Sequence, residues 1–340
     1  MAITVKLGFV PLIDCAIPLV AADMGFAAAE GIDLALERES SWASLRDKLA
    51  FGLIDAAHIL APLPLAMHLG LAGIPPVAMA VPMALGRGGN GITVSTDLYG
   101  RMQAADPAAM ERPGLGTAIA LKKVILADRA AGRPLLSFAS VFPFSCHHYE
   151  LRRWLLAGGI DPSTEVNLGI IAPPRMAESL GAGWIDGYCV GEPWNSRAVM
   201  RGTGKLVATK QDIWPDSHEK VLGLRQRWLA DNHDLTLSLI RALTRAALWA
   251  DAAENRQALA ALLAEPRHLG LPVEIIAAAL AQPGTAPLFH RDGATLPRPN
   301  IAREIMREMM AAGQWPPQIP AADDVWRPDI HHAAFSHSHR

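Results

Sequence analysis

An alternation of short apolar strands and helices at the start of the chain limits its fold more than any other feature. Residues 3–11 (ITVKLGFVP) have the alternating, β-branched pattern of a strand, and residues 15–29 carry apolar side chains at helical spacing. Gly31 follows the predicted helix, and residues 32–39 (IDLALERE) predict a second strand. Strands separated by helices of this length predict parallel βαβ units.

The same alternation continues along most of the chain. We expect a helix at 41–51, a buried strand at 54–62 and, after a glycine-rich loop, a strand at 92–95. The sequence therefore predicts an α/β fold of two lobes joined by more than one crossing of the chain. The expected parts are lobe I at residues 1–96 and 205–310, which includes C-terminal helices, lobe II at 97–204, and an extended or disordered tail at 311–340.

Composition and charge exclude several classes of protein. A chain of 340 residues is long enough for two lobes, and a net charge of −2 gives no reason to expect a nucleic-acid surface. No uninterrupted apolar run is long enough to span a bilayer, and no signal region precedes the first strand, so we expect a cytoplasmic protein. Three widely spaced cysteines, Cys15, Cys146 and Cys189, argue against a disulfide framework.

Residues 144–154 (FSCHHYELRRW) place a cysteine beside two histidines, which allows three interpretations. Contiguous Cys146, His147 and His148 point in different directions on a regular helix, whereas metal ligands on one helical face need i,i+3 or i,i+4 spacing. A cysteine nucleophile needs a third group to orient its histidine, and the sequence does not locate one. His147 at a helix N-terminus favours a small anion, because backbone N–H groups and the macrodipole there attract negative charge.

Common catalytic and cofactor motifs are absent from the chain. It contains no GxSxG, P-loop, HExxH or CxxC sequence. The GRGGNG loop has GxGxxG spacing, but a predicted strand follows it at 92–95, whereas a dinucleotide-binding loop opens a helix. We therefore expect no enzyme, no cofactor and no structural metal. The histidines of the last ten residues (HHAAFSHSHR) predict only a solvated end with adventitious metal binding.

Several segments in colinear order resemble one protein family. They include RESSWASLRDKLAFGLIDAAHILAPLPLA, GNGITVS, LRRWLLAGGIDP, APPRMAESLGAGWIDGYCVGEPWN and QDIWPDSHEKVLG, from about residue 5 to about residue 223. The family is the nitrate/bicarbonate-binding proteins of ABC importers, the NrtA/CmpA type. The resemblance implies a two-lobed periplasmic-binding-protein type II fold with a ligand cleft between the lobes.

The resemblance also implies an oxyanion site. The family's tryptophan in the SW motif corresponds to Trp42, its loop amide to Asn90, and its histidine before the second-lobe helix to His147. The glycine of CVGEPWN corresponds to Gly191, where a missing side chain would let the backbone approach a ligand. Lys220 in HEKVLG matches the lysine that pairs with nitrate.

Lys220 decides which anion we expect. A lysine supplies a compact cation for a monovalent anion, whereas bicarbonate-binding relatives use a carboxylate near this position to help hold calcium. Because Lys220, and not the adjacent Glu219, aligns with the family lysine, nitrate or nitrite is the expected ligand. The sequence leaves nitrate and nitrite open.

Two roles are compatible with this ligand. The family includes cytoplasmic nitrate/nitrite sensors of the NasS type, which control an RNA-binding antitermination protein of the NasT type. The resemblance and the absence of a leader favour such a sensor of nitrate assimilation, with no direct nucleic-acid binding and no membrane contact. The alternatives are the substrate-binding subunit of a nitrate, nitrite or bicarbonate ABC importer, and a thiamine-precursor-like or other small-molecule enzyme on the same fold.

Overall fold

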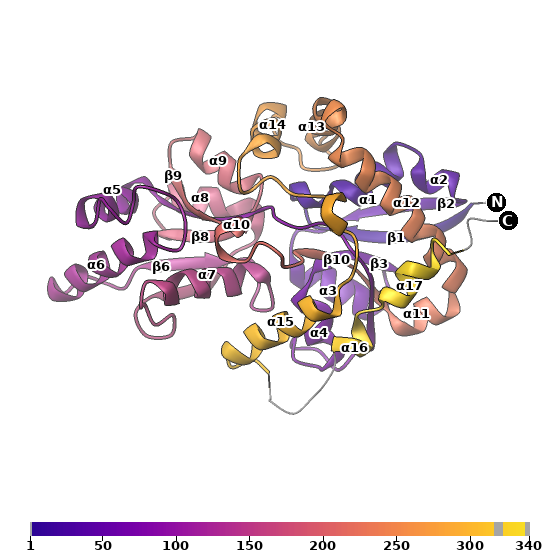
Figure 1. Ribbon diagram of the computed structural model, residues 1–340, viewed down its shortest axis with the longest axis horizontal. Coiled ribbons are helices and arrows are strands. Elements are labelled where there is room, and N and C mark those ends of the chain that lie inside the picture. The colour runs from indigo at the N-terminus through magenta and orange to yellow at the C-terminus, as the bar shows by residue number, and fades with distance from the viewer. Residues whose placement is uncertain (1, 316–321, 337–340) are drawn as a thin grey trace. The chain divides into compact units, whose positions relative to one another are not determined.

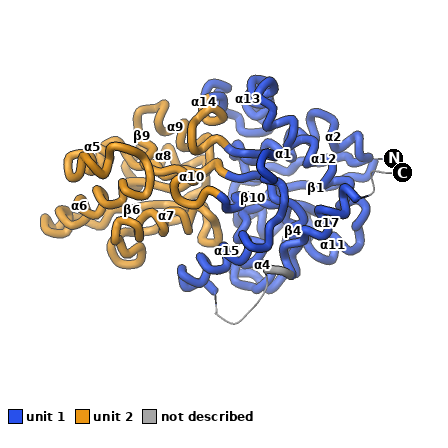
Figure 2. Tube along the Cα trace, viewed as in Figure 1, with its two compact units in different colours: residues 1–87, 216–277, 287–340 blue, residues 88–215, 278–286 orange. Residues whose placement is uncertain are grey.

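The computed structural model describes residues 2–315 and 322–336. The chain forms two compact units (Figure 2). Unit 1 contains residues 1–87, 216–277 and 287–340, and unit 2 contains residues 88–215 and 278–286. The chain therefore passes between the units more than once, as the sequence predicts.

Unit 1 is built on a five-stranded mixed sheet, with the order β2-β1-β3-β10-β4. β1 pairs in parallel with β2 and with β3, which gives the expected βαβ units, while β10 is antiparallel to both β3 and β4. The strands are β1 Ile3–Phe9, β2 Ile32–Arg38, β3 Ala56–Leu60, β4 Met79–Ala84 and β10 Lys220–Arg225.

Helices pack on this sheet, as Figure 1 shows. The predicted helix at 15–29 is divided at Gly25, whose φ of 77° is outside the helical region, so that α1 ends before α2 begins. The helices of unit 1 are α1 Ala16–Asp23, α2 Phe26–Ala29, α3 Trp42–Ala50, α4 Pro62–His68, α11 Gln226–Asp231, α12 His233–Asp251, α13 Arg256–Ala264, α15 Pro299–Ala311, α16 Ala322–Val325 and α17 Pro328–Ala333. α14, Val273–Ala281, ends in the part of the chain that belongs to unit 2.

Unit 2 has a second five-stranded mixed sheet, with the order β7-β6-β8-β5-β9. β6 is parallel to β7 and β8, and β5 is antiparallel to β8 and β9. The strands are β5 Asn90–Ser95, β6 Ser137–Ser140, β7 Asn167–Ile170, β8 Gly187–Gly191 and β9 Gly204–Thr209. The helices are α5 Thr96–Ala105, α6 Thr117–Ala130, α7 Cys146–Ala157, α8 Met176–Gly181, α9 Trp194–Met200 and α10 Lys210–Ile213.

The bounds of the two units differ from the expected lobes. The expected lobe I includes the residues of β5 and nearly all of β9, but both strands pair in the sheet of unit 2. The strand pattern identifies β5 correctly and gives no information about its partner, because pairing is a long-range contact. In unit 2, β9 ends at Thr209 and α10 follows it directly, started by a Thr209–Asp212 capping box.

The C-terminal segment also differs from the expected tail. Of residues 311–340, positions 316–321 and 337–340 lie outside the described residues, and much of the rest is helical. Trp326 forms a parallel bridge with Val81 of β4, and both side chains are buried. Composition alone predicts an extended or disordered tail here, because it does not show that Trp326 packs against β4.

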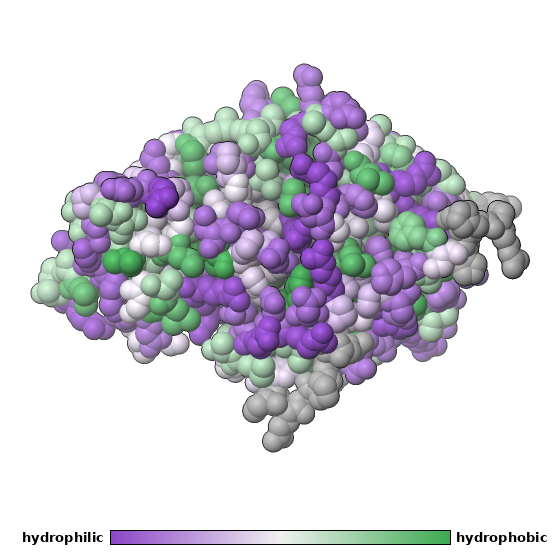
Figure 3. Space-filling view, in the orientation of Figure 1, coloured by the Kyte–Doolittle hydropathy of each residue, from purple (hydrophilic) through white to green (hydrophobic). Residues whose placement is uncertain are grey.

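Apolar side chains on the face drawn in Figure 3 are scattered between polar ones. Among the described residues, no helix combines the length and the apolar character that crossing a membrane requires.

Candidate functional site

Trp42 and Lys220, two of the predicted ligand-binding residues, lie together in unit 1. Trp42 is the first residue of α3, where the Ser41 hydroxyl accepts the Ser44 backbone N–H at 3.2 Å and caps the helix. Lys220 begins β10, and its Nζ lies 5.4 Å from the centre of the Trp42 ring. Both side chains are buried, which makes this a desolvated cation–π contact.

Two carboxylates surround the Lys220 ammonium. Its Nζ donates to Asp14 Oδ2 at 2.7 Å and to Glu219 Oε1 at 3.0 Å. The other Asp14 oxygen, Oδ1, lies 3.1 Å from Nε2 of His58, whose ring is 6.2 Å from that of Trp42. Asp14, Trp42, His58, Glu219 and Lys220 are called the Lys220 cluster below.

Ion pairing within the Lys220 cluster shifts the pKa values of Asp14 and Lys220 against the direction in which burial would shift them. Burial alone would raise the pKa of Asp14, but the charges of Lys220 and His58 lower it below its usual value. Burial alone would lower the pKa of Lys220, but Asp14 and Glu219 raise it. The ammonium therefore stays charged at neutral pH, and two carboxylates share its charge.

Asn90, His147 and Gly191, the other predicted residues, lie in unit 2. Asn90 begins β5 and is opposite Gly191, the last residue of β8, in the antiparallel register. His147 is the second residue of α7, and its side chain is buried. The Ser145 hydroxyl caps this helix by accepting the His148 backbone N–H at 3.1 Å.

A buried carboxylate, Glu150, connects Asn90 to α7. The Asn90 side-chain amide donates to Glu150 Oε2 at 2.9 Å, and Lys210 forms an ion pair with Glu150 Oε1. Glu150 is three residues after His147, so the two side chains share one helical face. Asn90, His147, Glu150, Gly191 and Lys210 are called the His147 cluster below.

The residues on either side of His147 are a cysteine and a second histidine. Burial and the charge of Arg152 lower the pKa of His148 to about 4, so this ring is neutral, and its Nδ1 lies 3.4 Å from Ser140 Oγ. Cys146 is buried and carries a thiol rather than a disulfide. Within the described ranges, three or more His, Cys, Asp or Glu side chains lie within metal-ligand distance only at Asp23, Glu265 and His268.

Sequence reasoning missed several members of both clusters. Asp14 lies three residues after the first predicted strand and Glu150 has i,i+3 spacing from His147, and both are signals present in the sequence. His58 lies within β3 and Lys210 directly follows β9. Neither carries such a signal, because its place in the sequence does not show which polar side chains it contacts in the fold.

Glu192 is not among the predicted site residues. It holds the segment after β8 in place. Its Oε2 accepts the Ser196 backbone N–H at 3.0 Å and its Oε1 accepts the Thr285 hydroxyl at 2.9 Å. Burial raises the pKa of this carboxyl to about 7. Glu192 therefore joins β8 to residues 278–286 of the same unit.

Comparison with known proteins gives the family. Residues 2–264 match the NMT1-like family. The nitrate import ATP-binding protein NrtC of Synechocystis sp. is 37% identical over 275 residues, which are 81% of this chain and 39% of that protein. The nitrate/nitrite binding protein NrtA of Synechococcus elongatus is 33% identical over 280 residues, 80% of this chain and 60% of that protein. The chain thus spans less than two thirds of either relative.

Solved structures agree on the fold. The periplasmic nitrate-binding protein NrtA from Synechocystis PCC 6803 superposes with a TM-score of 0.90 at 26% identity, covering 98% of this chain and 88% of that one. The alkanesulfonate-binding protein SsuA from Xanthomonas axonopodis pv. citri, with a TM-score of 0.69 and 15% identity over 95% of this chain and 98% of that one, shares the fold alone. The expected two-lobed periplasmic-binding-protein type II fold is confirmed, and with it a non-catalytic solute-binding family. The chain belongs to the NMT1-like family and is related to the nitrate- and bicarbonate-transport proteins of the NrtA, NrtC and CmpC type.

Proposed function

We propose that this chain binds a small oxyanion, nitrate or nitrite, without catalysing a reaction. The observation that carries the proposal is the buried Lys220 ammonium, which lies against the face of Trp42. A compact cation beside a flat aromatic ring suits a planar monovalent anion. The relatives named for nitrate, NrtC and NrtA, support the choice of ligand.

Each predicted residue has a role in this proposal. Lys220 supplies the charge and Trp42 a flat apolar face. Asn90 and His147 supply hydrogen-bond donors, and the N-terminus of α7 adds a favourable interaction of about 0.3–1 kcal/mol for an exposed charge. Gly191 leaves room for its own backbone to approach the anion.

The carboxylates of the Lys220 cluster support a second candidate, bicarbonate bound together with a divalent cation. Asp14 and Glu219 both contact Lys220, so the cluster holds more carboxylates than ammonium groups. Calcium prefers carboxylate oxygens, and such a surplus would suit it. Nitrate requires no added cation, so the two candidates differ in their dependence on calcium.

Isothermal titration calorimetry separates the candidates. The full chain is titrated with nitrate, nitrite and bicarbonate, each with calcium and with EDTA. We expect nitrate or nitrite binding that EDTA does not change, and loss of binding in Lys220→Ala and His147→Ala. Lys6→Ala and His233→Ala, which change exposed residues, are the matched controls. Binding of bicarbonate alone, and only with calcium, would overturn the choice of nitrate.

We further propose that the bound anion is sensed rather than delivered. The proposal is a cytoplasmic nitrate/nitrite sensor that controls an antitermination partner of the NasT type, and the alternative is the substrate-binding subunit of an ABC importer. The sensor role rests on the family resemblance. The importer alternative is supported by NrtC, 37% identical, which is named a nitrate import protein.

Size-exclusion chromatography tests the sensor role. The chain is mixed with a NasT-type antitermination protein from the same genome, with and without nitrate. We expect a complex that nitrate dissociates. Two proteins that elute separately under both conditions would favour the importer role.

A further inference from the structure

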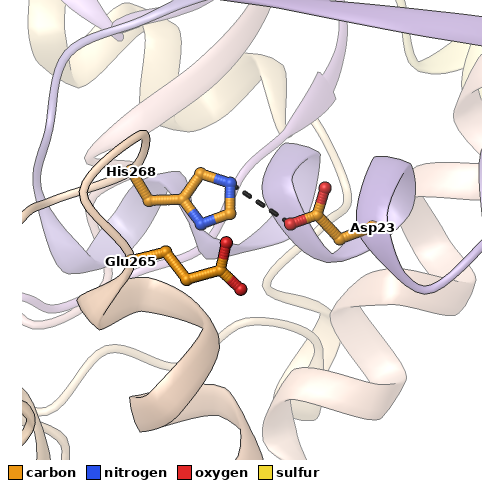
Figure 4. Close-up of side chains that lie close together, drawn as sticks. All are labelled: Asp23, Glu265 and His268. Atoms are coloured by element: carbon orange, nitrogen blue, oxygen red, sulfur yellow. Dashed lines mark ion pairs between the residues drawn. The ribbon is translucent and has the colours of Figure 1, made fainter.

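Three side chains with metal-ligating atoms meet in unit 1, outside the Lys220 cluster and the His147 cluster (Figure 4). Asp23 is the last residue of α1, and Glu265 and His268 lie in the turn that follows α13. Backbone hydrogen bonds close this turn, from His268 N to Glu265 O at 2.9 Å and from Gly270 N to Glu265 O at 3.1 Å. The main chain therefore holds the Glu265 and His268 side chains on one side of the turn, facing Asp23.

The His268 ring is oriented in the way that metal-binding histidines are. Its Nδ1 lies 2.8 Å from the carbonyl oxygen of Leu262, which can only accept, so Nδ1 carries a proton and donates. In the neutral ring, Nε2 then presents a lone pair. Histidines that ligate a metal usually donate their other ring N–H in this way, to a backbone carbonyl, a carboxylate or water.

The lone pair of Nε2 faces another acceptor. His268 is 2% exposed, and its Nε2 lies 3.2 Å from Asp23 Oδ2. Among the residues that the structure describes, Nε2 makes no hydrogen bond of acceptable geometry. Two acceptor atoms at this distance need a positive charge between or beside them, either a proton or a cation.

We propose that Asp23, Glu265 and His268 bind a divalent transition metal ion of the Zn²⁺ type. One ligand atom from each residue lies within 4.8 Å of the others. Zinc bonds of about 2.0–2.2 Å at tetrahedral angles place two ligand atoms about 3.3 Å apart, close to the observed separation of Nε2 and Oδ2. An imidazole with two carboxylates favours Zn²⁺ over Ca²⁺ or Mg²⁺, and a water molecule would fill the fourth position.

When no metal is bound, Arg267 supplies the positive charge beside the Asp23 and Glu265 carboxylates. Its Nη2 lies 2.9 Å from Asp23 Oδ2 and its Nε lies 2.7 Å from Glu265 Oε2. The arginine side chain is 62% exposed, so it can swing into solvent when a metal ion takes its place. Metal binding and the Arg267 ion pairs therefore compete for the same two carboxylates.

The test measures zinc stoichiometry and affinity in the full chain after treatment with EDTA and its removal. We expect His268→Gln to lose one equivalent of Zn²⁺ relative to the wild type, while His233→Gln, which changes a half-exposed histidine, loses none. Histidines near the C-terminus contribute equally to all three proteins, so they cancel in the difference. Co²⁺ should give visible absorption bands of a four-coordinate site that His268→Gln removes. Equal zinc stoichiometry in the wild type and His268→Gln would overturn the proposal.

A second variant tests the competition and does not remove a ligand. Arg267→Gln changes an exposed side chain, and we expect it to bind Zn²⁺ more tightly than the wild type. Unchanged or weaker affinity would overturn the proposal, even if His268→Gln fails to fold. Far-UV circular dichroism in EDTA establishes the folding of each variant, and parallel titrations with Ca²⁺ and Mg²⁺ should show no binding that depends on His268.

Discussion

Lys220→Met tests whether the buried ammonium neutralises the carboxylates around it. The Lys220 side chain has no exposed surface, and its Nζ lies 2.7 Å from Asp14 and 3.0 Å from Glu219. Methionine keeps a similar volume and removes the charge, which leaves two buried carboxylates without the Lys220 ammonium. Breaking a buried ion pair by removing one partner costs about 3–5 kcal/mol. We expect the free energy of unfolding at pH 7 to fall by this amount.

The pH dependence of the loss has a definite sign. The folded pKa of Asp14 is lowered, so its stabilising contribution is present above its usual value of 3.8 and is lost as the pH falls through the lower, folded value. The folded pKa of Lys220 is raised, so its contribution is present below its usual value of 10.5 and is lost as the pH rises through the higher, folded value. The difference between wild type and Lys220→Met should therefore be largest between these limits and shrink in acid, where the carboxylates become protonated.

Urea unfolding followed by far-UV circular dichroism measures this difference. Lys6→Met, which removes an exposed lysine from β1, is the control and should change stability by less than about 0.5 kcal/mol. Adding Asp14→Asn to Lys220→Met should restore about 1 kcal/mol or more, because it removes one of the two buried carboxylate charges that faced Lys220. A loss below about 1 kcal/mol in Lys220→Met, or a loss that does not shrink in acid, would refute the reasoning.

Two further predictions concern unit 2. Glu150→Gln removes the Glu150 carboxylate charge from the buried Lys210 ammonium and should cost about 3–5 kcal/mol in urea unfolding. Glu178→Gln, whose partner is Arg197 and whose own side chain is 59% exposed, should cost less than about 1 kcal/mol, and equal losses would contradict the assignment. Burial raises the folded pKa of Glu192 to about 7 from its usual 4.5, so its contribution is present below 4.5 and is lost as the pH rises through about 7. Between about pH 4.5 and 8 the wild type should lose about 3 kcal/mol more than Glu192→Gln, and parallel stability curves would count against this pKa.

Local sequence patterns predicted much of the architecture because they report local physics. β1 and α3 occupy nearly the expected ranges, since alternation and helical spacing mark which side chains are buried. The order of strands in the two sheets was beyond such patterns. β5 carries the expected strand signal, yet its partners are β8 and β9, about a hundred residues further along the chain.

The predicted site residues show the same division. The motifs selected Trp42 and Lys220, and also His147 at the start of a helix, because each lies in a short segment with a recognisable pattern. The motifs did not show that Lys220 shares its charge with Asp14, which precedes it by 206 residues.

The sequence by itself determined the alternating elements, the family and the residue types available for an anion. Only the tertiary structure decided which charges are neutralised. Ion pairing depends on separations of a few ångströms between side chains that the fold brings together from distant segments, and burial makes those few contacts strong. The Lys220 cluster and the Asp23, Glu265 and His268 group both arise in this way.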